Sequence, residues 1–208
     1  MGSAQPKQFL ELAGKPLLMH AMQAFLNYAP DIRLVLVLPE QEFAAWKNLC
    51  QQHRFHSAHQ LAIGGPTRFH SVKNGLRFIP EQALVAIHDG VRPLVSLDTI
   101  SRAFHFASKF GNAIPGIEAA DSLRLTDGAL SQPLPRDRVR LIQTPQCFRA
   151  SLIKRAYNRN YHESFTDDAS VLEADGERLF LVEGHRENIK ITTPADLVFA
   201  EAWLRRGN

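Results

Sequence analysis

The sequence predicts an α/β fold, a Rossmann-like three-layer sandwich with a mostly parallel central sheet. Short runs rich in Val, Ile and Leu alternate with longer segments of helical periodicity, which is the pattern of a sheet with crossover helices. The runs at 34–38 and 84–88 are almost continuously apolar, as in strands covered on both faces, so we expect them to be central strands. The 208 residues are 45% hydrophobic and 22% charged, which suits one domain with a buried core.

The elements follow from these periodicities in chain order. The apolar runs predict strands at Leu34–Leu38, Gln60–Ile63, Leu84–His88, Asn112–Ile117, Leu141–Gln143 and Leu179–Val182. The intervals predict helices at Leu17–Leu26, Gln41–Gln52, Arg68–Phe78, Leu97–Phe110, Ser151–Asn158, Asp167–Glu173 and Ala195–Arg205. The last helix has a clear start signal, because Thr193 can cap it, Pro194 suits its first turn and Asp196 favours its positive end.

The polar segment 122–135 lacks helical periodicity and carries Asp127-Gly128 at its middle. Asp-Gly between two strand candidates is typical of a hairpin turn. Because a lone hairpin is marginally stable in water, we expect this protruding β-hairpin arm to pack on a second copy of the chain. The prediction is therefore a homodimer.

Composition disfavours several classes of protein. The net charge is only +3 and its cations are scattered, so no nucleic-acid partner is expected. Cys50 and Cys147 lie far apart, which indicates neither a zinc site nor a disulfide framework and favours a reducing, cytoplasmic location. No apolar run approaches the roughly 18 residues of a membrane span, and the start lacks the sections of a signal peptide. Hydrolase, dehydrogenase and zinc-protease motifs are also missing.

The most specific motif is His88-Asp89-Gly90-Val91-Arg92-Pro93, at the carboxyl end of a predicted buried strand. Ligands bind at that edge of an open α/β sheet. Asp89 could hold Mg²⁺, which prefers one or two carboxylates together with substrate phosphates. It could equally cap the loop before the following helix, and Arg92 could tether that loop without touching a ligand.

A second motif, Gly64-Gly65-Pro66-Thr67-Arg68-Phe69-His70-Ser71, also joins a strand to a helix. Paired glycines let a backbone come close to a flat ring or a phosphate, and Ser71 could then bond a base edge. A plain tight turn explains the glycines equally well.

Further candidates lie in the second half of the chain and near its start. Gln143-Thr144-Pro145-Gln146 closes a predicted strand, and Thr166 precedes a helix that it could simply cap. Lys190 lies between two isoleucines, so strand alternation would place it on the opposite face, either towards a phosphate or in solvent. Lys7 is the most interesting early cation, although a terminal surface lysine is a common feature.

The order of these motifs resembles the 2-C-methyl-D-erythritol 4-phosphate cytidylyltransferase family of the nucleotidyltransferase α/β superfamily. The resemblance runs nearly end to end, in order and in spacing, over Pro6-Lys7-Gln8, Gly64-Gly65 with Arg68 and Ser71, His88-Asp89-Gly90 with Arg92-Pro93, Thr144-Pro145-Gln146, Thr166-Asp167 and Asn188-Ile189-Lys190. It implies one nucleotidyltransferase domain over 1–208, with the arm at about 122–135 embracing a second subunit.

The resemblance also implies roles for particular residues. The nucleotide would be bound by Gly64, Gly65, Ser71, Asp89 and Gly90, with Mg²⁺ on Asp89. The sugar-alcohol phosphate would be bound by Arg92, Ser122, Arg136, Thr144, Thr166 and Lys190, some of them reaching across from a dimer partner. The catalytic set would be Lys7, Asp89, Arg136 and Lys190.

The implied reaction transfers CMP from CTP to 2-C-methyl-D-erythritol 4-phosphate, giving 4-diphosphocytidyl-2-C-methyl-D-erythritol and pyrophosphate, in isoprenoid precursor synthesis. Two alternatives are a ribitol 5-phosphate cytidylyltransferase and a noncatalytic protein that binds a sugar nucleotide.

The sequence departs from the family pattern in three places. Relatives open with a strand and a glycine-rich loop that ends in arginine, whereas this sequence begins with Met1-Gly2-Ser3, which resembles only the tail of that loop. If this segment is truly absent, the chain would lack one central strand and a phosphate cradle; the alternative is that the segment is only omitted from the sequence. Pro66 stands where relatives often have a polar residue, and Ser122 where threonine is common.

Overall fold

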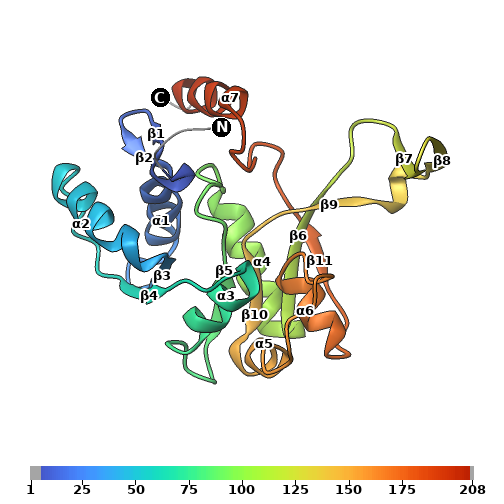
Figure 1. Cartoon of the computed structure of the whole chain (residues 1–208), viewed down its shortest axis with the longest axis horizontal. Helices are drawn as coiled ribbons and strands as arrows, with labels where there is room; N and C mark the ends of the chain where they lie inside the picture. The colour runs from blue at the N-terminus through green and yellow to red at the C-terminus, as the bar shows by residue number, and fades with distance from the viewer. Residues whose placement is uncertain (1–5, 207–208) are drawn as a thin grey trace.

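The computed structural model describes residues 6–206 and has an α/β architecture (Figure 1). Its α-helices are α1 Leu17–Tyr28, α2 Phe43–Gln52, α3 Arg68–Leu76, α4 Leu97–Phe110, α5 Ala150–Ala156, α6 Asp168–Ala174 and α7 Pro194–Arg206. These are the seven predicted helices, with ends displaced by at most two residues. Helical periodicity therefore sufficed to place them.

The strands include the six predicted ones and several more. The predicted strands are β3 Val35–Leu38, β4 Gln60–Ile63, β5 Leu84–Ile87, β6 Asn112–Glu118, β9 Arg140–Ile142 and β11 Leu181–Glu183. The hairpin consists of β7 Leu123–Asp127 and β8 Leu130–Leu134. The sequence did not predict β1 Glu11–Leu12, β2 Lys15–Pro16 and β10 Gln146–Arg149.

The main sheet is mixed, so the prediction of a mostly parallel sheet was wrong. Its strands follow the order β11-β6-β10-β5, and β9 pairs with β6. The unpredicted β10 lies between β5 and β6 and runs antiparallel to both, and β9 is antiparallel to β6. Of these pairings only β11 with β6 is parallel. The two reversed strands, β9 and β10, thus leave β5, β6 and β11 pointing the same way while making most pairings antiparallel.

The prediction that β3 and β5 are central strands was also wrong. Among the described residues, β3 pairs only with β4, and β5 only with β10. Apolar residues on both faces of a strand indicate that helices cover both sides of the sheet, because side chains point out of the sheet. Neighbouring strands pair through backbone hydrogen bonds, so the burial of side chains does not show how many neighbours a strand has in its sheet.

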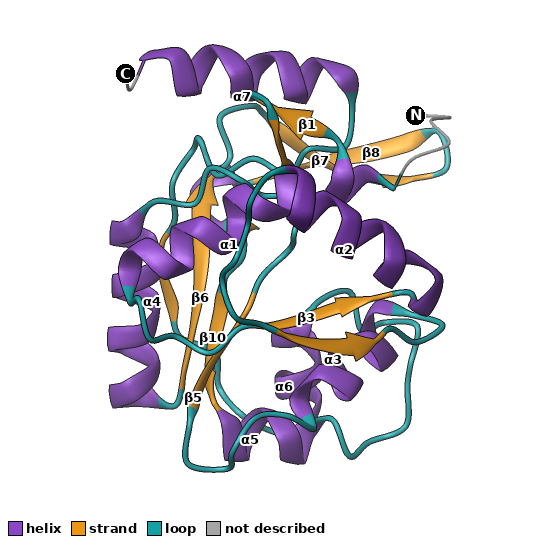
Figure 2. Ribbon diagram, turned by 90° about the vertical axis from the view of Figure 1, so that its left-hand side faces the viewer, coloured by secondary structure: helices purple, strands orange, loops and turns teal. Residues whose placement is uncertain are grey.

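Helices cover both faces of the main sheet, which confirms the layered architecture. Figure 2 shows β5, β6 and β10 between α4 on one side and α6 on the other. Side chains alternate accordingly along β10. Cys147 packs with Ala103 and Ala107 of α4, whereas the next residue, Phe148, packs with Ile153 of α5 in the largest apolar cluster.

The predicted hairpin is confirmed, and it protrudes from the rest of the chain (Figure 1). The turn itself is Gly128–Ala129, because Asp127 already pairs with Leu130. Gly128 has a positive φ of 57°, which glycine adopts without strain. Packing of the arm on a second copy stays a prediction.

Local signals at the ends of the chain have different outcomes. Thr193 caps α7 as predicted, because its hydroxyl accepts from the backbone N–H of Asp196, whose carboxylate accepts from that of Thr193.

Among the described helices, none combines the length and apolar character that a membrane crossing requires. The comparison of Met1-Gly2-Ser3 with the tail of a glycine-rich loop concerns residues outside 6–206.

We expect Phe148→Ala to lower the free energy of unfolding by about 3–5 kcal/mol, because a fully buried ring leaves a cavity between sheet and helices. Urea denaturation measures the change. The matched control is Phe78→Ala, because Phe78 is 49% exposed, and a cost of less than about 1 kcal/mol is expected there. Equal losses in the two variants would contradict this placement of the core.

Candidate active site

The three strands that point the same way end at one edge of the sheet, and their loops carry the motifs. Asp89 follows β5, and Lys190 lies in the loop after β11. Residues around Lys190 are not a strand, contrary to the alternation argument. A single backbone bond, from Ile191 N to Val91 O at 2.9 Å, ties this loop to the loop after β5. Ligand binding at this edge is the general behaviour of open α/β sheets.

Asp89 is the centre of a cluster of charged side chains. Its Oδ2 atom lies 3.1 Å from Nζ of Lys190 and accepts from Nε of Arg92 at 3.3 Å. Its Oδ1 atom lies 3.8 Å from Nε of Arg68. Burial opposes ionisation of Asp89, but the ammonium of Lys190 and the two guanidiniums outweigh it and hold the pKa of this carboxyl below its ordinary value. The carboxylate is therefore charged at neutral pH.

A chain of hydrogen bonds fixes the backbone at Asp89. Nε2 of His88 lies 3.0 Å from the carbonyl oxygen of Arg92, so this nitrogen carries the proton. Nδ1 then accepts from the hydroxyl of Thr144 at 3.0 Å, and that hydroxyl accepts the backbone N–H of Asp89 at 3.0 Å. The hydroxyl hydrogen of Thr144 is thus already committed within the protein, and contact of Thr144 with a substrate stays a prediction.

Asn188 anchors the opposite side of the cluster. It is fully buried, and its side-chain amide donates to the backbone carbonyl of Thr144 at 2.7 Å. The backbone carbonyl of Asn188 accepts from the guanidinium of Arg92 at 2.7 Å. Its Oδ1 atom is buried without a hydrogen-bond partner among the described residues. The second guanidinium bond makes Arg92 the loop tether that the sequence offered as an alternative, while it also touches Asp89.

The glycine motif forms a compact turn between β4 and α3. A Cβ atom on Gly65 would collide with that of His70, so only glycine fits there. Ser71 closes the turn, because its hydroxyl accepts from Gly65 N at 3.0 Å and donates to Thr67 O at 3.0 Å. Gly64 continues the pairing with β3 through a 2.8 Å bond to Leu38 O. Base recognition by this turn stays a prediction.

Three other candidates lie nearby or farther out. Lys7 lies beside the Lys190 loop, with Nζ 3.5 Å from the carbonyl of Thr192. Thr166 is exposed and does not cap α6, whose N-cap is Asp167 in a capping box with Ser170. Gly90 packs under Leu18, where a Cβ would approach to 2.9 Å.

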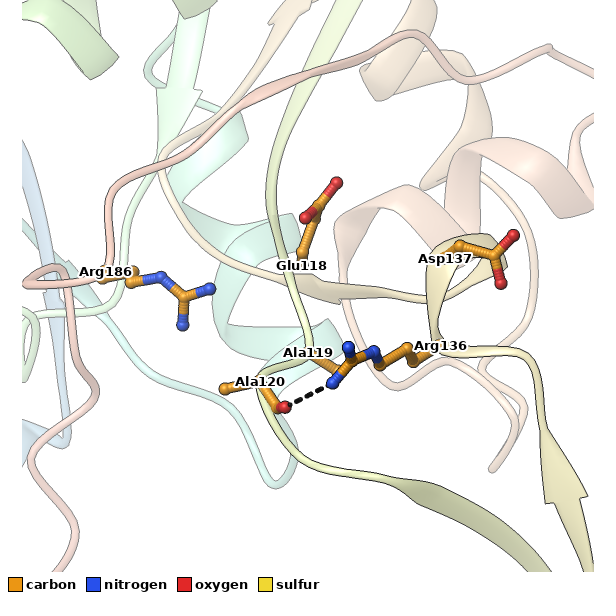
Figure 3. Close-up of a pocket in the computed structure, with 6 residues that line it drawn as sticks. All are labelled: Glu118, Ala119, Ala120, Arg136, Asp137 and Arg186. Atoms are coloured by element: carbon orange, nitrogen blue, oxygen red, sulfur yellow. Dashed lines mark hydrogen bonds between the residues drawn. The ribbon is translucent and has the colours of Figure 1, made fainter.

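Arg136 lies at the base of the arm in a separate pocket of about 320 Å³ (Figure 3). Its guanidinium donates to Ala120 O at 3.1 Å, and Arg186 enters the same pocket from the loop that leads to Lys190. The pocket is lined by Glu118, Ala119, Ala120, Arg136, Asp137 and Arg186. Within residues 6–206, no hydrogen bond or ion pair connects Ser122, Arg136 or Thr166 to the Asp89 cluster.

The Mg²⁺ that the resemblance implies fits this site only in company with a nucleotide. The described part of the chain has no group of three or more His, Cys, Asp or Glu side chains able to hold a metal ion. Asp89 offers one carboxylate, and its Oδ1 has no hydrogen-bond partner in that part. One carboxylate plus phosphate oxygens is a set that Mg²⁺ accepts.

Sequence reasoning assigned no role to the residues that hold Arg68. Nη1 and Nη2 of Arg68 donate to Asp168 at 2.9 and 2.5 Å, and the hydroxyl of Tyr157 donates to the same carboxylate at 2.6 Å. Asp168 directly follows the Thr166-Asp167 motif. Its partner lies 100 positions away, so no local pattern could pair them.

Comparison with known proteins identifies the family. The model of the 2-C-methyl-D-erythritol 4-phosphate cytidylyltransferase family (IspD) matches residues 1–206. The chain belongs to this family. It is 48% identical over 204 residues to the family's enzyme from Bacteroides thetaiotaomicron, a match that covers 98% of this chain and 93% of the relative. The enzyme from Bacteroides fragilis is also 48% identical over the same shares.

Solved structures of the IspD family have the same fold. The 2-C-methyl-D-erythritol 4-phosphate cytidylyltransferase of Thermus thermophilus has a TM-score of 0.80 at 32% identity, over 98% of this chain and 96% of that one. The 4-diphosphocytidyl-2C-methyl-D-erythritol synthase of Anaerococcus prevotii has a TM-score of 0.85 at 28% identity, over 99% and 92%.

We expect the stability of this IspD chain to depend on pH through His88, which faces Asp89 and Arg92. Burial lowers the pKa of His88 to about 4 from 6.5. The unfolded chain therefore binds more protons between these values, so stability falls as the pH is lowered through this window. A shift of this size amounts to about 3 kcal/mol.

His88→Gln removes this component. The difference in unfolding free energy between the original chain and the variant should therefore shrink from pH 7 to pH 4.5, measured by urea denaturation at each pH. A difference that stays constant would show that His88 does not resist protonation in the folded state.

Proposed function

We propose that the chain transfers CMP from CTP to 2-C-methyl-D-erythritol 4-phosphate, releasing pyrophosphate. The observation that carries this proposal is the Asp89 cluster, in which cations from three parts of the chain meet at the ligand edge of an IspD fold. The relatives named above carry the same activity in their names. The free cysteines Cys50 and Cys147 suit a reducing compartment, and we infer a cytoplasmic location.

The acceptor needs no general base. A phosphate monoester has a second pKa of about 6, so its attacking oxygen is already an anion at neutral pH. This oxygen forms a bond to the α-phosphorus of CTP, the bond from that phosphorus to the bridging oxygen breaks, and pyrophosphate leaves with the bonding electrons. The protein must therefore bring two anions together and stabilise the charge that develops on the leaving group.

Lysines with uncommitted protons are suited to that task. The side chain of Lys190 is 47% exposed and pairs with one carboxylate oxygen, which leaves N–H groups for phosphate oxygens. Among residues 6–206, the ammonium of Lys7 bonds a single carbonyl, that of Thr192 in the loop that carries Lys190. Mg²⁺ bound with the nucleotide beside Asp89 would neutralise further phosphate charge. Asp89 holds Lys190 in position, and Gly64, Gly65, Ser71 and Gly90 would form the wall for the base and ribose.

The acceptor phosphate is a ligand for arginines, because a guanidinium binds phosphate oxygens in pairs. Arg136 and Ser122 lie at the base of the arm, and neither contacts the Asp89 cluster of the same chain. We therefore place them at the site of a partner subunit, with Arg92 and Thr144 contributed in cis.

The arm is suited to a partner because it exposes apolar side chains. Register and alternation put Leu123, Leu125, Leu130 and Leu134 on one face of the hairpin. Leu125 is 52% and Leu130 76% exposed in the single chain. An apolar hairpin face in water favours association, so we infer a homodimer.

We expect pyrophosphate release from CTP and Mg²⁺ with 2-C-methyl-D-erythritol 4-phosphate and not with ribitol 5-phosphate. Lys190→Ala should lower turnover at least about tenfold, because losing about 1.4 kcal/mol of transition-state stabilisation has this effect. A coupled pyrophosphate assay measures both.

The matched control is Lys109→Ala, an exposed lysine in the last turn of α4, which should leave turnover unchanged. Release with ribitol 5-phosphate alone would favour the other alditol, and silence with both acceptors would favour a binding protein. Unchanged turnover in Lys190→Ala would remove this lysine from the catalytic set.

We expect Leu125→Arg to shift the chain from dimer to monomer in sedimentation velocity, because it puts a charge into the apolar face of the arm. Thr126→Arg is the control, since it adds the same charge to the opposite face of the same strand. A monomeric original chain, or equal behaviour of the two variants, would contradict the role of this face.

A further inference from the structure

The guanidinium of Arg68 lies between the carboxylates of Asp168 and Asp89, and its contacts with the two differ. Both terminal nitrogens, Nη1 and Nη2, bond Asp168 in a bidentate pair. The remaining N–H group, on Nε, is the atom nearest to Asp89, at 3.8 Å. This separation is an ion pair and exceeds a hydrogen bond. Arg68 therefore faces Asp89 without bonding it.

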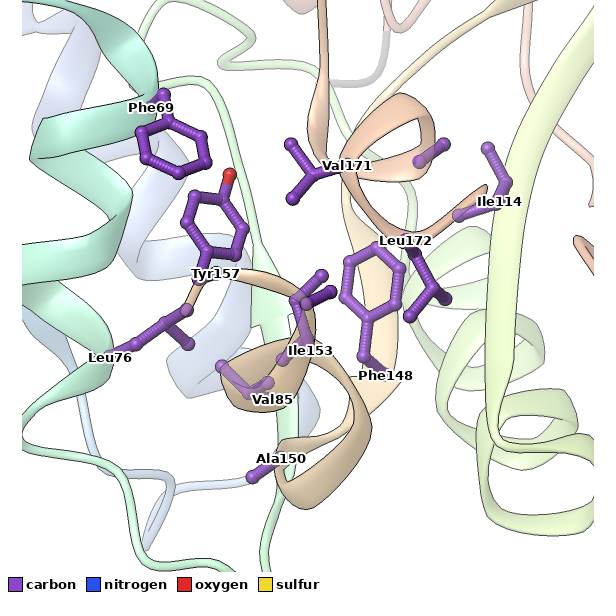
Figure 4. Close-up of a cluster of buried hydrophobic side chains, with 12 residues drawn as sticks. Phe69, Leu76, Val85, Ile114, Phe148, Ala150, Ile153, Tyr157, Val171 and Leu172 are labelled. Atoms are coloured by element: carbon purple, nitrogen blue, oxygen red, sulfur yellow. The ribbon is translucent and has the colours of Figure 1, made fainter. Parts of the chain in front are cut away.

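The Asp168 side of this arrangement is rigid. The side chain of Asp168 has no solvent exposure, and the hydroxyl of Tyr157 donates to its Oδ1 atom. The ring of Tyr157 stacks on Phe69 at 4.7 Å and belongs to the cluster shown in Figure 4, where it lies between Phe69 and Ile153. A buried carboxylate of this kind holds its guanidinium strongly, because separation would leave a charge unpaired.

The Asp89 side is asymmetric between its two oxygens. Lys190 and Arg92 both approach Oδ2, at 3.1 and 3.3 Å. Oδ1 accepts no hydrogen bond from any residue of 6–206, and it is the oxygen that Arg68 approaches, at 3.8 Å. One oxygen of the carboxylate is thus occupied by the protein, and the other retains its lone pairs for a ligand.

We propose that Asp168, fixed by Tyr157, holds Arg68 back from Asp89 and so keeps Oδ1 of Asp89 available to the bound nucleotide. Arg68 and Asp168 are then positioning residues, which touch no substrate. The ligand of Oδ1 is either a Mg²⁺ ion carried by the phosphates or a ribose hydroxyl. Both bind a carboxylate oxygen through its lone pairs. This inference rests on the proposed function, because it concerns the same nucleotide site.

The proposal makes removal of Asp168 harmful through Arg68. In Asp168→Asn the guanidinium loses its anionic partner, and Asp89 is the nearest remaining carboxylate. A movement of less than about 1 Å would bring Nε within hydrogen-bond distance of Oδ1. The nucleotide would then have to displace a charged hydrogen bond before it could use that oxygen.

The test measures CTP affinity by isothermal titration calorimetry without acceptor, so that no turnover occurs, with and without Mg²⁺. We expect Asp168→Asn to weaken binding at least about fivefold, and Arg68→Gln combined with Asp168→Asn to restore it to within about twofold. The double variant replaces the buried ion pair with a neutral amide pair, and urea denaturation of all variants separates affinity from loss of folding. An effect confined to the Mg²⁺ titrations identifies the metal as the ligand, and an equal effect without Mg²⁺ identifies a hydroxyl.

Two results would overturn the inference. Unchanged affinity in folded Asp168→Asn would show that Arg68 stays in place without its partner. Affinity in the double variant that is no better than in the single one would show that Arg68 binds the nucleotide directly. These results differ from failure of the proposed function, in which the original chain itself binds no CTP or releases no pyrophosphate with the acceptor.

Discussion

The site depends on one charged group, the carboxylate of Asp89, which has three cations around it at 3.1, 3.3 and 3.8 Å. Arg68 comes from the first turn of α3, Arg92 from the loop after β5 and Lys190 from the loop after β11. Without an anion between them these positive charges would repel one another, so the carboxylate lowers the cost of bringing them together. The carboxylate of Asp89 therefore allows several positive side chains to lie close together in the proposed phosphate site.

Strand β10, one of the two reversed strands of the mixed sheet, also positions the residue that supports this carboxylate. In the register of β10 with β5, Gln146 lies opposite Ile87, so β10 begins where β5 ends. The residue two positions before Gln146 is Thr144, which consequently reaches the backbone of Asp89 and the ring of His88. A parallel strand in this place would have begun at the far edge of the sheet. The reversed strand thus has a direct consequence for the geometry of the site.

Sequence reasoning succeeded where a signal is local. Periodicity placed the helices, and Asp127-Gly128 placed the hairpin within one residue of its turn. It failed for β10, because Gln146–Arg149 is short and follows a proline, and for the pairing of β3 and β5, because apolar faces do not count neighbours in a sheet. The order of the motifs pointed to Asp89, Arg92 and Lys190, and the fold brings these three side chains into contact. The Arg68–Asp168 pair depends on two residues 100 positions apart, and only the fold reveals it.

The cations of the site differ in how much of their charge is already compensated, and this difference suggests a division of labour. Arg68 gives two nitrogens to a buried carboxylate, and Arg92 gives one to a carboxylate and one to a carbonyl. These arginines are held in place and cannot follow a phosphoryl group as it moves. Lys7 and Lys190 have flexible stems and N–H groups without partners among residues 6–206, so in the proposed reaction they can shorten their bonds to phosphate oxygens as charge grows on the leaving pyrophosphate. Transition-state stabilisation requires interactions that strengthen during the reaction, so in the proposed reaction we assign it to the lysines and assign to the arginines the geometry in which the lysines act.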